Sequence, residues 1–446
     1  MKVFFWIYNV FLLLVISVIF QNFSITAVGM VGILILYFCC RDLENVKYKD
    51  LIAVITIAIL FMLLLYVGLI EKFGEPYYAS DDIRYEYYGN LLFQKNIFKF
   101  KDIPYIEGMF YAKGYLIIIA WIQKIGSFFG EYSTISPRVL NLYLWISVAV
   151  LMSKKMGESV ADKKIVRKTF ALLALFPNAL YIASFVYRDV FIIFLIVVSI
   201  YNFEKLTEGF KKGIFNGITF VRIPIVLFCL YGLYYSRQQM LYVVAIIFLL
   251  SLFQEKLKPQ RSSRVIVIVA ATIAGVILLQ FTGGIELLSE MNEGYSSYLS
   301  DQAGGLSGMI FSRSLLPFGI FLRFAYGFVT PFPAALLSLN YFDEPIYSLV
   351  IASTCFGTIF QIFLLPYLYK GVKRMDYPAI KFLGMYGPII LTTFTFRHFI
   401  MVYPFAACIL AQQIEITGCR TRKKYAVYVL LLIGIAAAFY VLLKLF

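Results

Sequence analysis

Charged residues and metal ligands are scarce in this chain. Only 15% of its 446 residues are Asp, Glu, Lys or Arg, and it contains a single histidine. The six cysteines include no Cys-x-x-Cys pair, and one histidine cannot form a cluster of nitrogen ligands. The sequence therefore predicts no zinc site and no disulfide framework, and we expect the chain to work without a metal or other cofactor.

Most of the chain is apolar instead. Hydrophobic residues make up 61% of it, and stretches such as 51–70 and 425–446 are apolar nearly all round. A soluble core would alternate polar and apolar faces, whereas these runs are long enough to cross about 30 Å of hydrocarbon. The run at 3–20 lacks a small-residue cleavage site, so we interpret it as a first helix. The sequence predicts an all-α, polytopic transmembrane bundle.

Basic residues mark the connections between these runs. The net charge is +15, but its residues form no compact basic module of the kind that binds nucleic acid. They gather at 154–168, 205–212, 256–264, 370–374 and 420–424, which the positive-inside rule assigns to the cytoplasm together with the N-terminus. About 13 spans are predicted. They lie at 3–20, 25–40, 49–70, 138–153, 168–186, 190–204, 217–235, 239–253, 265–282, 346–369, 380–396, 399–415 and 425–444.

Two further apolar stretches do not fit this alternation as spans. The stretch at 114–129 is short for a membrane span and includes Lys124. The stretch at 314–339 is interrupted by prolines and Arg323. Such breaks in a helix would leave backbone groups unpaired in lipid. We expect both to be juxtamembrane or re-entrant helices at the outer face. The chain is then one integral membrane domain, 1–446, with two large outer loops at 71–137 and 283–345.

The first outer loop contains an acidic pair. Asp81 and Asp82 are followed directly by an aromatic-rich segment that includes Tyr85. One of two adjacent carboxylates can accept a proton from a sugar hydroxyl while the other orients a neighbour, and their like charges raise one pKa. A plainer interpretation is a helix cap made by Ser80 or Asp81. The tyrosines could stack on sugars, although aromatics are expected at a membrane interface anyway.

Three arginines, Arg188, Arg237 and Arg397, occur where one predicted helix ends on the outer side and the next begins. The returning apolar runs are short, about 14 residues or about 21 Å for the first, so the turns should lie below the membrane surface in a wet cavity. Guanidinium groups and helix N-termini together form a site for phosphate or pyrophosphate. The alternative is that Arg188 pairs with Asp189 and the other two reach lipid headgroups.

Other residues on the outer side are weaker candidates. His398, beside Arg397, could act as a base or only orient a neighbour. The second outer loop holds glycines at 283, 284, 304, 305 and 308, which are compatible with a mobile flap or with a plain flexible connection. Its Arg313 and Arg323 could reach the same anion or anchor an interfacial helix.

These patterns resemble known families. The acidic pair, the amphipathic segment at 113–126 and Pro137-Arg138-Val139-Leu140-Asn141 at the start of the next helix look like the GT-C membrane glycosyltransferases. The Arg188-Asp189 dipeptide, the Arg237 turn and Pro331-Phe332-Pro333 are similar to bacterial O-antigen repeat-unit polymerases of the Wzy type. The resemblance extends over most of residues 60–415, but no single motif in it is specific.

This resemblance implies a GT-C-like bundle in the bacterial inner membrane, with its active site facing the periplasm. It implies an enzyme of lipopolysaccharide or related surface-polysaccharide synthesis that joins undecaprenyl-pyrophosphate-linked oligosaccharides, with a chain-length regulator protein as a possible partner. We expect Asp81, Asp82 or His398 to act as the base. Arg188, Asp189, Arg237, Arg313, Arg323, Arg397 and Tyr85 are expected to bind pyrophosphate and substrate. The alternatives are a GT-C transferase of single sugars and, from another class, a flippase for lipid-linked sugars.

Overall fold

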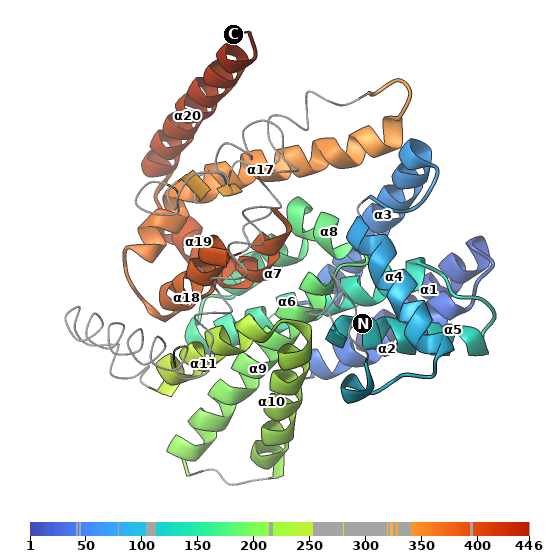
Figure 1. The fold of residues 1–446 in the computed structure, drawn as a ribbon. Helices are drawn as coiled ribbons and strands as arrows, with labels where there is room; N and C mark the ends of the chain where they lie inside the picture. The colour runs from blue at the N-terminus through green and yellow to red at the C-terminus, as the bar shows by residue number, and fades with distance from the viewer. Residues whose placement is uncertain are drawn as a thin grey trace.

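The computed structural model describes residues 1–41, 43, 46–78, 80–103, 113–213, 217–252, 340–392 and 396–445, together with residues 280, 319, 322, 323, 327 and 328. Within these residues, every extended regular element is a helix (Figure 1). The helices are α1 Lys2–Ile19, α2 Ser24–Cys39, α3 Tyr48–Phe73, α4 Ser80–Gln94, η1 Phe100–Asp102, α5 Lys113–Phe128, α6 Ile135–Ser159, α7 Lys163–Ala174, α8 Pro177–Ala183, α9 Arg188–Lys211, α10 Gly217–Ser236, α11 Gln238–Leu252, α17 Pro345–Val372, α18 Tyr377–Thr392, η4 Phe396–Met401, α19 Tyr403–Ile416 and α20 Cys419–Leu445.

Several of these helices are long and apolar enough to cross a membrane. Six of the described helices meet that test alone, and the bent pair α7 and α8 makes a seventh if it is one span. They are α1, α3, α6, α9, residues 219–236 of α10, and α17. The prediction of a multi-pass helical membrane protein is therefore confirmed, whereas the count of about 13 spans and the GT-C-like arrangement stay predictions. The expected helix at 265–282 lies outside the described residues, apart from residue 280.

The helix termini meet at two opposite ends of the bundle. We call one end the arginine end, because Arg188 and Arg237 lie at helix termini there. At this end α3 finishes where α17 starts, and the Glu71 carboxylate accepts hydrogen bonds of 3.0 Å from the backbone N–H groups of Ile346 and Tyr347. At the other, the lysine end, Lys168 of α7 pairs with Glu415 of α19.

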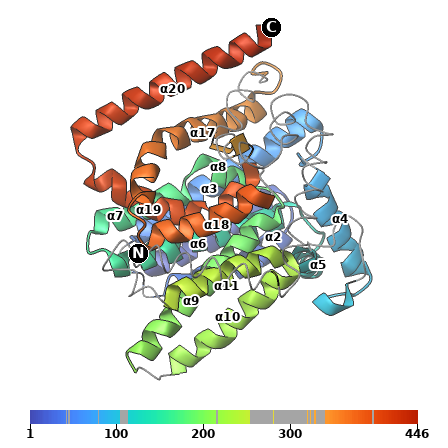
Figure 2. The ribbon, with the colours of Figure 1, turned by 60° about the vertical axis from the view of Figure 1, so that its left-hand side comes forward.

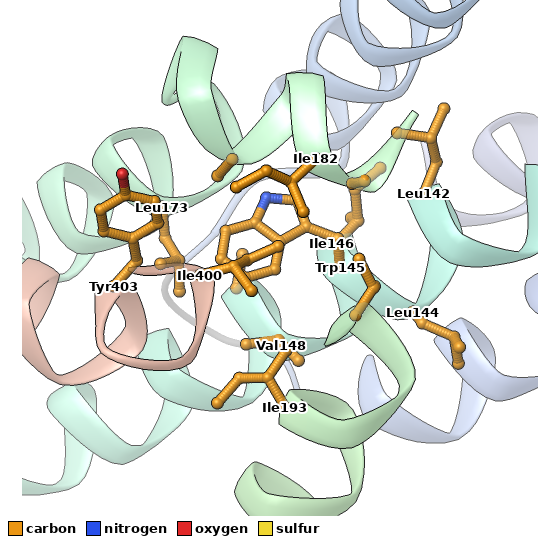
Figure 3. Packing of buried hydrophobic residues seen from close by; sticks show 14 of the residues in the cluster. Leu142, Leu144, Trp145, Ile146, Val148, Leu173, Ile182, Ile193, Ile400 and Tyr403 are labelled. Carbon is orange, nitrogen blue, oxygen red and sulfur yellow. The ribbon is translucent and has the colours of Figure 1, made fainter. Parts of the chain in front are cut away.

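Helix α6 forms the centre of the bundle. Its membrane-length segment is completely buried, because it is largely apolar, with exceptions such as Arg138 and Asn141, and other helices surround it. Around Trp145, Figure 3 shows Leu173 of α7, Ile182 of α8, Ile193 of α9 and Ile400 of η4. This core therefore joins α9, which begins at Arg188, to η4, which contains Arg397.

Two of the predicted helices have different boundaries in the structure. The expected span at 168–186 is broken, since α7 and α8 are bent by 50° at a short break, and Pro177 opens α8 because proline fits the first turn of a helix. The expected short helix at 190–204 is wrong as well: α9 has 24 residues and continues through Glu204 to Lys211. Its length therefore gives no reason to place Arg188 below the membrane surface.

The helices of the first outer loop, α4 and α5, are packed into the rest of the bundle at the arginine end. Helix α5 has 16 residues, and it packs against α4 so closely that a Cβ on Gly89 would come within 2.4 Å of Ile119. Helix α20 differs from them, since it extends away from the other helices in both views (Figure 2). The expected second outer loop, 283–345, is described only at a few positions and at its end.

Candidate functional site

Asp189 lies at the centre of a charged cluster at the arginine end. It is the second residue of α9 and is 1% exposed. Its Oδ1 accepts a hydrogen bond of 3.3 Å from Nη1 of Arg237, and its Oδ2 lies 3.6 Å from Nε of Arg397. His398 Nε2 is 3.9 Å from the same Oδ1. One buried carboxylate therefore gathers cationic side chains from two other segments of the chain.

Arg397 connects this cluster to the acidic pair of the first outer loop. Its Nη1 pairs with Oδ2 of Asp81, and its guanidinium lies 5.2 Å from the ring centroid of Tyr187. The side chains of Arg397 and Asp81 are 21% and 28% exposed, whereas Arg237 and His398 are fully buried. A ligand would therefore meet Asp81 and Arg397 first, and Asp81 has a role besides any helix cap.

Arg188 joins the cluster from its own position at the start of α9. Its Nη1 donates a hydrogen bond of 3.2 Å to the carbonyl oxygen of Ser236, the last residue of α10. The two arginine-bearing turns are thus bonded to each other, and Arg237 follows Ser236 directly. The alternative that Arg237 reaches lipid headgroups is excluded, because this side chain is 1% exposed and paired with Asp189.

Helix N-termini contribute to the same region. Arg188 opens α9, and Arg237 immediately precedes α11, so the positive ends of two helix dipoles lie at the cluster. Arg397 departs from the expected arrangement. It lies in the 3-10 helix η4, six residues before α19 begins, so no α-helix starts directly after it.

Two side chains of α6 hold the turn that carries Arg188. Arg138 Nη1 donates a hydrogen bond of 3.0 Å to the carbonyl of Ser184, and Nη2 donates to the carbonyl of Pro76, ahead of α4. Asn141 Nδ2 donates to the carbonyls of Phe185 and Tyr187, at 2.8 and 3.1 Å. These bonds satisfy backbone groups of a buried non-helical turn, which would otherwise be costly.

The roles of Arg138 and Asn141 were missed in the sequence. Both are almost completely buried, and they are three positions apart, which places them on one face of α6. The available signal was their polarity within a largely apolar helix segment. The sequence alone could not show that their partners are the carbonyl groups of residues 76, 184, 185 and 187.

Asp82 has a different environment from Asp81. Its side chain is fully buried, and among the described residues neither carboxylate oxygen has a hydrogen-bond partner. Burial raises the pKa of Asp82 from 3.8 to about 7, while the positive charge of Arg138 opposes the rise and the negative charge of Glu86 adds to it. The acidic pair is thus divided into one ion-paired, partly exposed carboxylate and one enclosed carboxyl that binds its proton near neutral pH.

The remaining predicted site residues lie elsewhere or cannot be placed. Tyr85 is 2% exposed and packs on Tyr115 with ring centroids 5.2 Å apart, and burial raises its pKa to about 12. It is therefore a neutral core residue near the cluster and offers no open stacking surface. Arg323 is buried, but the segments around it are not described. Arg313 and the Pro331-Phe332-Pro333 element lie outside the described residues.

Comparisons with other proteins add no identification, since no family model, no curated protein and no solved structure matches this chain. Within the part of the chain that the structure describes, no three His, Cys, Asp or Glu side chains are grouped in a way that could hold a metal ion. Chemically, the cluster offers buried and partly exposed guanidinium groups, two helix N-termini and, in Asp81, a partly exposed carboxylate. This combination suits an anionic group attached to a ligand that also carries exchangeable protons.

Proposed function

We propose that this protein is a membrane glycosyltransferase that joins undecaprenyl-pyrophosphate-linked oligosaccharide repeat units at the periplasmic face of the bacterial inner membrane. The observation that carries the proposal is the continuous ion-pair chain from Asp81 through Arg397 and Asp189 to Arg237. It combines an anion site with an accessible carboxylate, which are the two groups that transfer from a pyrophosphate-linked donor needs.

In the proposed reaction, the arginines bind the pyrophosphate of the donor. As the bond between the anomeric carbon and the phosphate oxygen breaks, negative charge grows on that oxygen, and fixed guanidinium groups and helix N-termini stabilise it. Asp189 orients Arg237 and Arg397, with which it is already in contact. Polyprenyl pyrophosphate is the leaving group, so no other co-reactant is required.

Asp81 is the proposed base. A base must reach the hydroxyl from which it takes the proton, and Asp81 is partly exposed whereas Asp82 is enclosed. The incoming pyrophosphate competes with Asp81 for Arg397, and this competition frees the carboxylate. Asp81 then accepts the proton of an acceptor hydroxyl as its oxygen bonds to the anomeric carbon. His398, which is fully buried beside Asp189, is proposed to orient that carboxylate and not to contact substrate.

The proposal is tested with purified protein in lipid nanodiscs. The only substrate is an undecaprenyl-pyrophosphate-linked oligosaccharide, and the products are separated by size. Elongation without any other donor supports a repeat-unit polymerase. Elongation that requires a separate polyprenyl-phosphate monosaccharide would instead indicate a transferase of single sugars, and transbilayer movement without any product would indicate a flippase.

Variants connect the activity to the site. Asp81→Asn and Arg188→Gln should abolish elongation, while the protein still inserts and elutes as a single species. Arg167→Gln is the matched control, because Arg167 forms an exposed ion pair with Asp50 at the lysine end. Normal product length in both site variants would refute the proposed function.

A further inference from the structure

A polar cleft lies beside α4 at the arginine end, outside the ion-pair chain. Its volume is about 510 Å³, and it is bordered by residues from the ends of α1 and α3, from α4 and α5, and from the turn before α6. At its wall is Glu86, which is 6% exposed. Tyr77 donates a hydrogen bond of 2.6 Å to one carboxylate oxygen of Glu86, and Thr134 donates to the other.

The chemistry of this cleft differs from that of the arginine cluster. None of the described residues that line it is basic, and its one charged side chain is the carboxylate of Glu86. Asn90 and Gln123 add amide groups that can both donate and accept hydrogen bonds. Tyr87, which is 62% exposed, adds an aromatic surface with a hydroxyl at its edge.

These properties select a class of ligand. A buried carboxylate repels phosphates and acidic sugars, so an anion is disfavoured here although it is favoured at the neighbouring arginines. A ligand with many hydroxyl groups satisfies amides, a carboxylate and tyrosines together, since each hydroxyl both donates and accepts. Apolar faces of such a ligand can pack on Tyr87. The cleft thus suits an uncharged saccharide.

We propose that this cleft binds the uncharged acceptor saccharide, and this assignment rests on the proposed glycosyl transfer. Helix α4 carries both parts of the site: Asp81 and Asp82 occupy its first turn and Glu86 its second. Asp81 lies five residues before Glu86, which is about 7.5 Å along the helix axis. A saccharide of more than one ring that is held at Glu86 can therefore extend along α4 to the carboxylate that accepts its proton, while the donor pyrophosphate lies on the arginines.

The test measures glycan binding separately from catalysis. Protein in fluorescent nanodiscs is applied to an array of neutral, N-acetylated and acidic microbial oligosaccharides. We expect binding to neutral or N-acetylated glycans and none to acidic ones. Tyr87→Ala and Asn90→Leu, both at accessible positions, should weaken that binding by at least about tenfold, as should Glu86→Gln. Tyr369→Ala removes a tyrosine that is 70% exposed at the lysine end and is the control.

The outcomes separate this inference from the proposed function. No bound glycan, a preference for acidic glycans, or full binding by all three cleft variants would overturn it. Arg397→Ala should abolish elongation but retain glycan binding, because Arg397 does not line the cleft. If glycans bind as expected but the wild-type protein elongates nothing, the proposed function fails and the cleft remains a saccharide site. If elongation occurs without glycan binding in the cleft, the proposed function stands and the assignment of the cleft as a saccharide site fails.

Discussion

Helix α9 carries a buried carboxylate at its start and another in its second half, and the two differ in the ion-pair partners that surround them. Asp189 lies at the arginine end and Glu204 at the lysine end, about 22 Å apart along the helix. Both are at most 2% exposed. Each pairs with basic side chains from segments distant in the sequence. The sequence alone does not distinguish the two, because each is simply an acidic residue in an apolar helix.

The cluster at Glu204 is closed and balanced. Lys381 of α18 and Lys155 of α6 both pair with Glu204, the second at 3.1 Å, and the Tyr377 hydroxyl donates a hydrogen bond of 2.7 Å to it. Among the described residues, the network has three lysines and three glutamates. They are Lys155, Lys205, Lys381, Glu158, Glu204 and Glu208. We interpret it as a structural connection between helices.

The cluster at Asp189 is looser and is built on arginines. The contacts of Asp189 with Arg237, Arg397 and His398 are 3.3–3.9 Å long. Arg397 also pairs with Asp81, which is partly exposed. A planar guanidinium group suits a bidentate anion better than a lysine ammonium does. We therefore interpret the lysine end as a connection that stabilises the fold, whereas the arginine end is where we propose that ligand binds.

Removal of Glu204 should have the largest effect on stability. Glu204→Ala leaves Lys381 and Lys155 without their shared carboxylate in a buried site, and breaking such a pair costs about 3–5 kcal/mol. Thermal unfolding in detergent measures the loss. The double variant Glu204→Leu with Lys381→Met removes Glu204 together with its more buried partner, while Lys155 keeps its pairs with Glu158 and Glu208, and it should recover much of the stability. An unchanged Tm in Glu204→Ala would show that this network is not a structural connection.

Arg397→Lys should have the next largest effect, on activity and not on stability. Lysine keeps the charge but cannot bridge Asp81 and Asp189 with a planar fork, and loss of one transition-state donor lowers rates by about 10²–10³-fold. Elongation per folded molecule is the measurement, with Tm as a check. Arg167→Lys at the lysine end is the control. Equal elongation by both variants would remove the functional contrast between the ends.

Asp82→Asn should change the dependence of stability on pH. Because burial raises the pKa of Asp82 to about 7, the folded chain keeps a proton there that the unfolded chain loses above 3.8. Stability should therefore fall as pH rises through this window. The amide removes this dependence and should stabilise the chain by about 1–3 kcal/mol above pH 7.

Tm measured at about pH 5 and about pH 8 tests this prediction. The wild-type protein should lose more stability between these values than Asp82→Asn does. Asp102→Asn, which replaces an exposed acid of the same loop, is the control and should follow the wild-type curve. If the two variants gave parallel curves, a raised pKa at Asp82 would be ruled out.

The smallest effect is expected for Arg167→Ala. Its ion pair with Asp50, at 3.1 Å, involves an arginine side chain that is 49% exposed, and exposed pairs contribute about 0–1 kcal/mol. Chemical denaturation should place the variant within that range of wild type. A loss as large as that of Glu204→Ala would mean that exposed pairs at the lysine end also hold the bundle together.

Sequence patterns predicted the class of fold but misjudged particular helices. The apolar runs predicted a multi-pass bundle because lipid requires long apolar helices. The run at 168–186 was interpreted as one helix although Pro177 stands within it, a signal that could have been used. The end of the span was placed at 204 because Lys205, Lys211 and Lys212 were interpreted as a cytoplasmic connection. The sequence could not show that Lys155 and Lys381, from other helices, pair with Glu204 inside the bundle.

The candidate site was predictable to a similar extent. The alternation of basic connections placed Arg188, Arg237 and Arg397 at one end before any contact was known. It could not show that Asp189 joins Arg237 to Arg397, or that Asp81 and Asp82 differ in exposure. Both facts depend on distances between segments far apart in the chain. Arg138 and Asn141 show the same limit, since their partners are backbone carbonyls that no side-chain pattern encodes.

The apolar runs and the basic connections were enough to predict a bundle of membrane-crossing helices with Arg188, Arg237 and Arg397 near the ends of its helices. Hydropathy and charge carry this information because each segment partitions between lipid and water largely on its own. The tertiary structure was needed to show which carboxylate neutralises which cation, and that a polar cleft whose described lining holds a glutamate and no basic residue lies beside the cationic cluster. Both depend on packing between distant helices. That packing sets the burial of each charge and the distances between charges, and these set the strength of every electrostatic interaction.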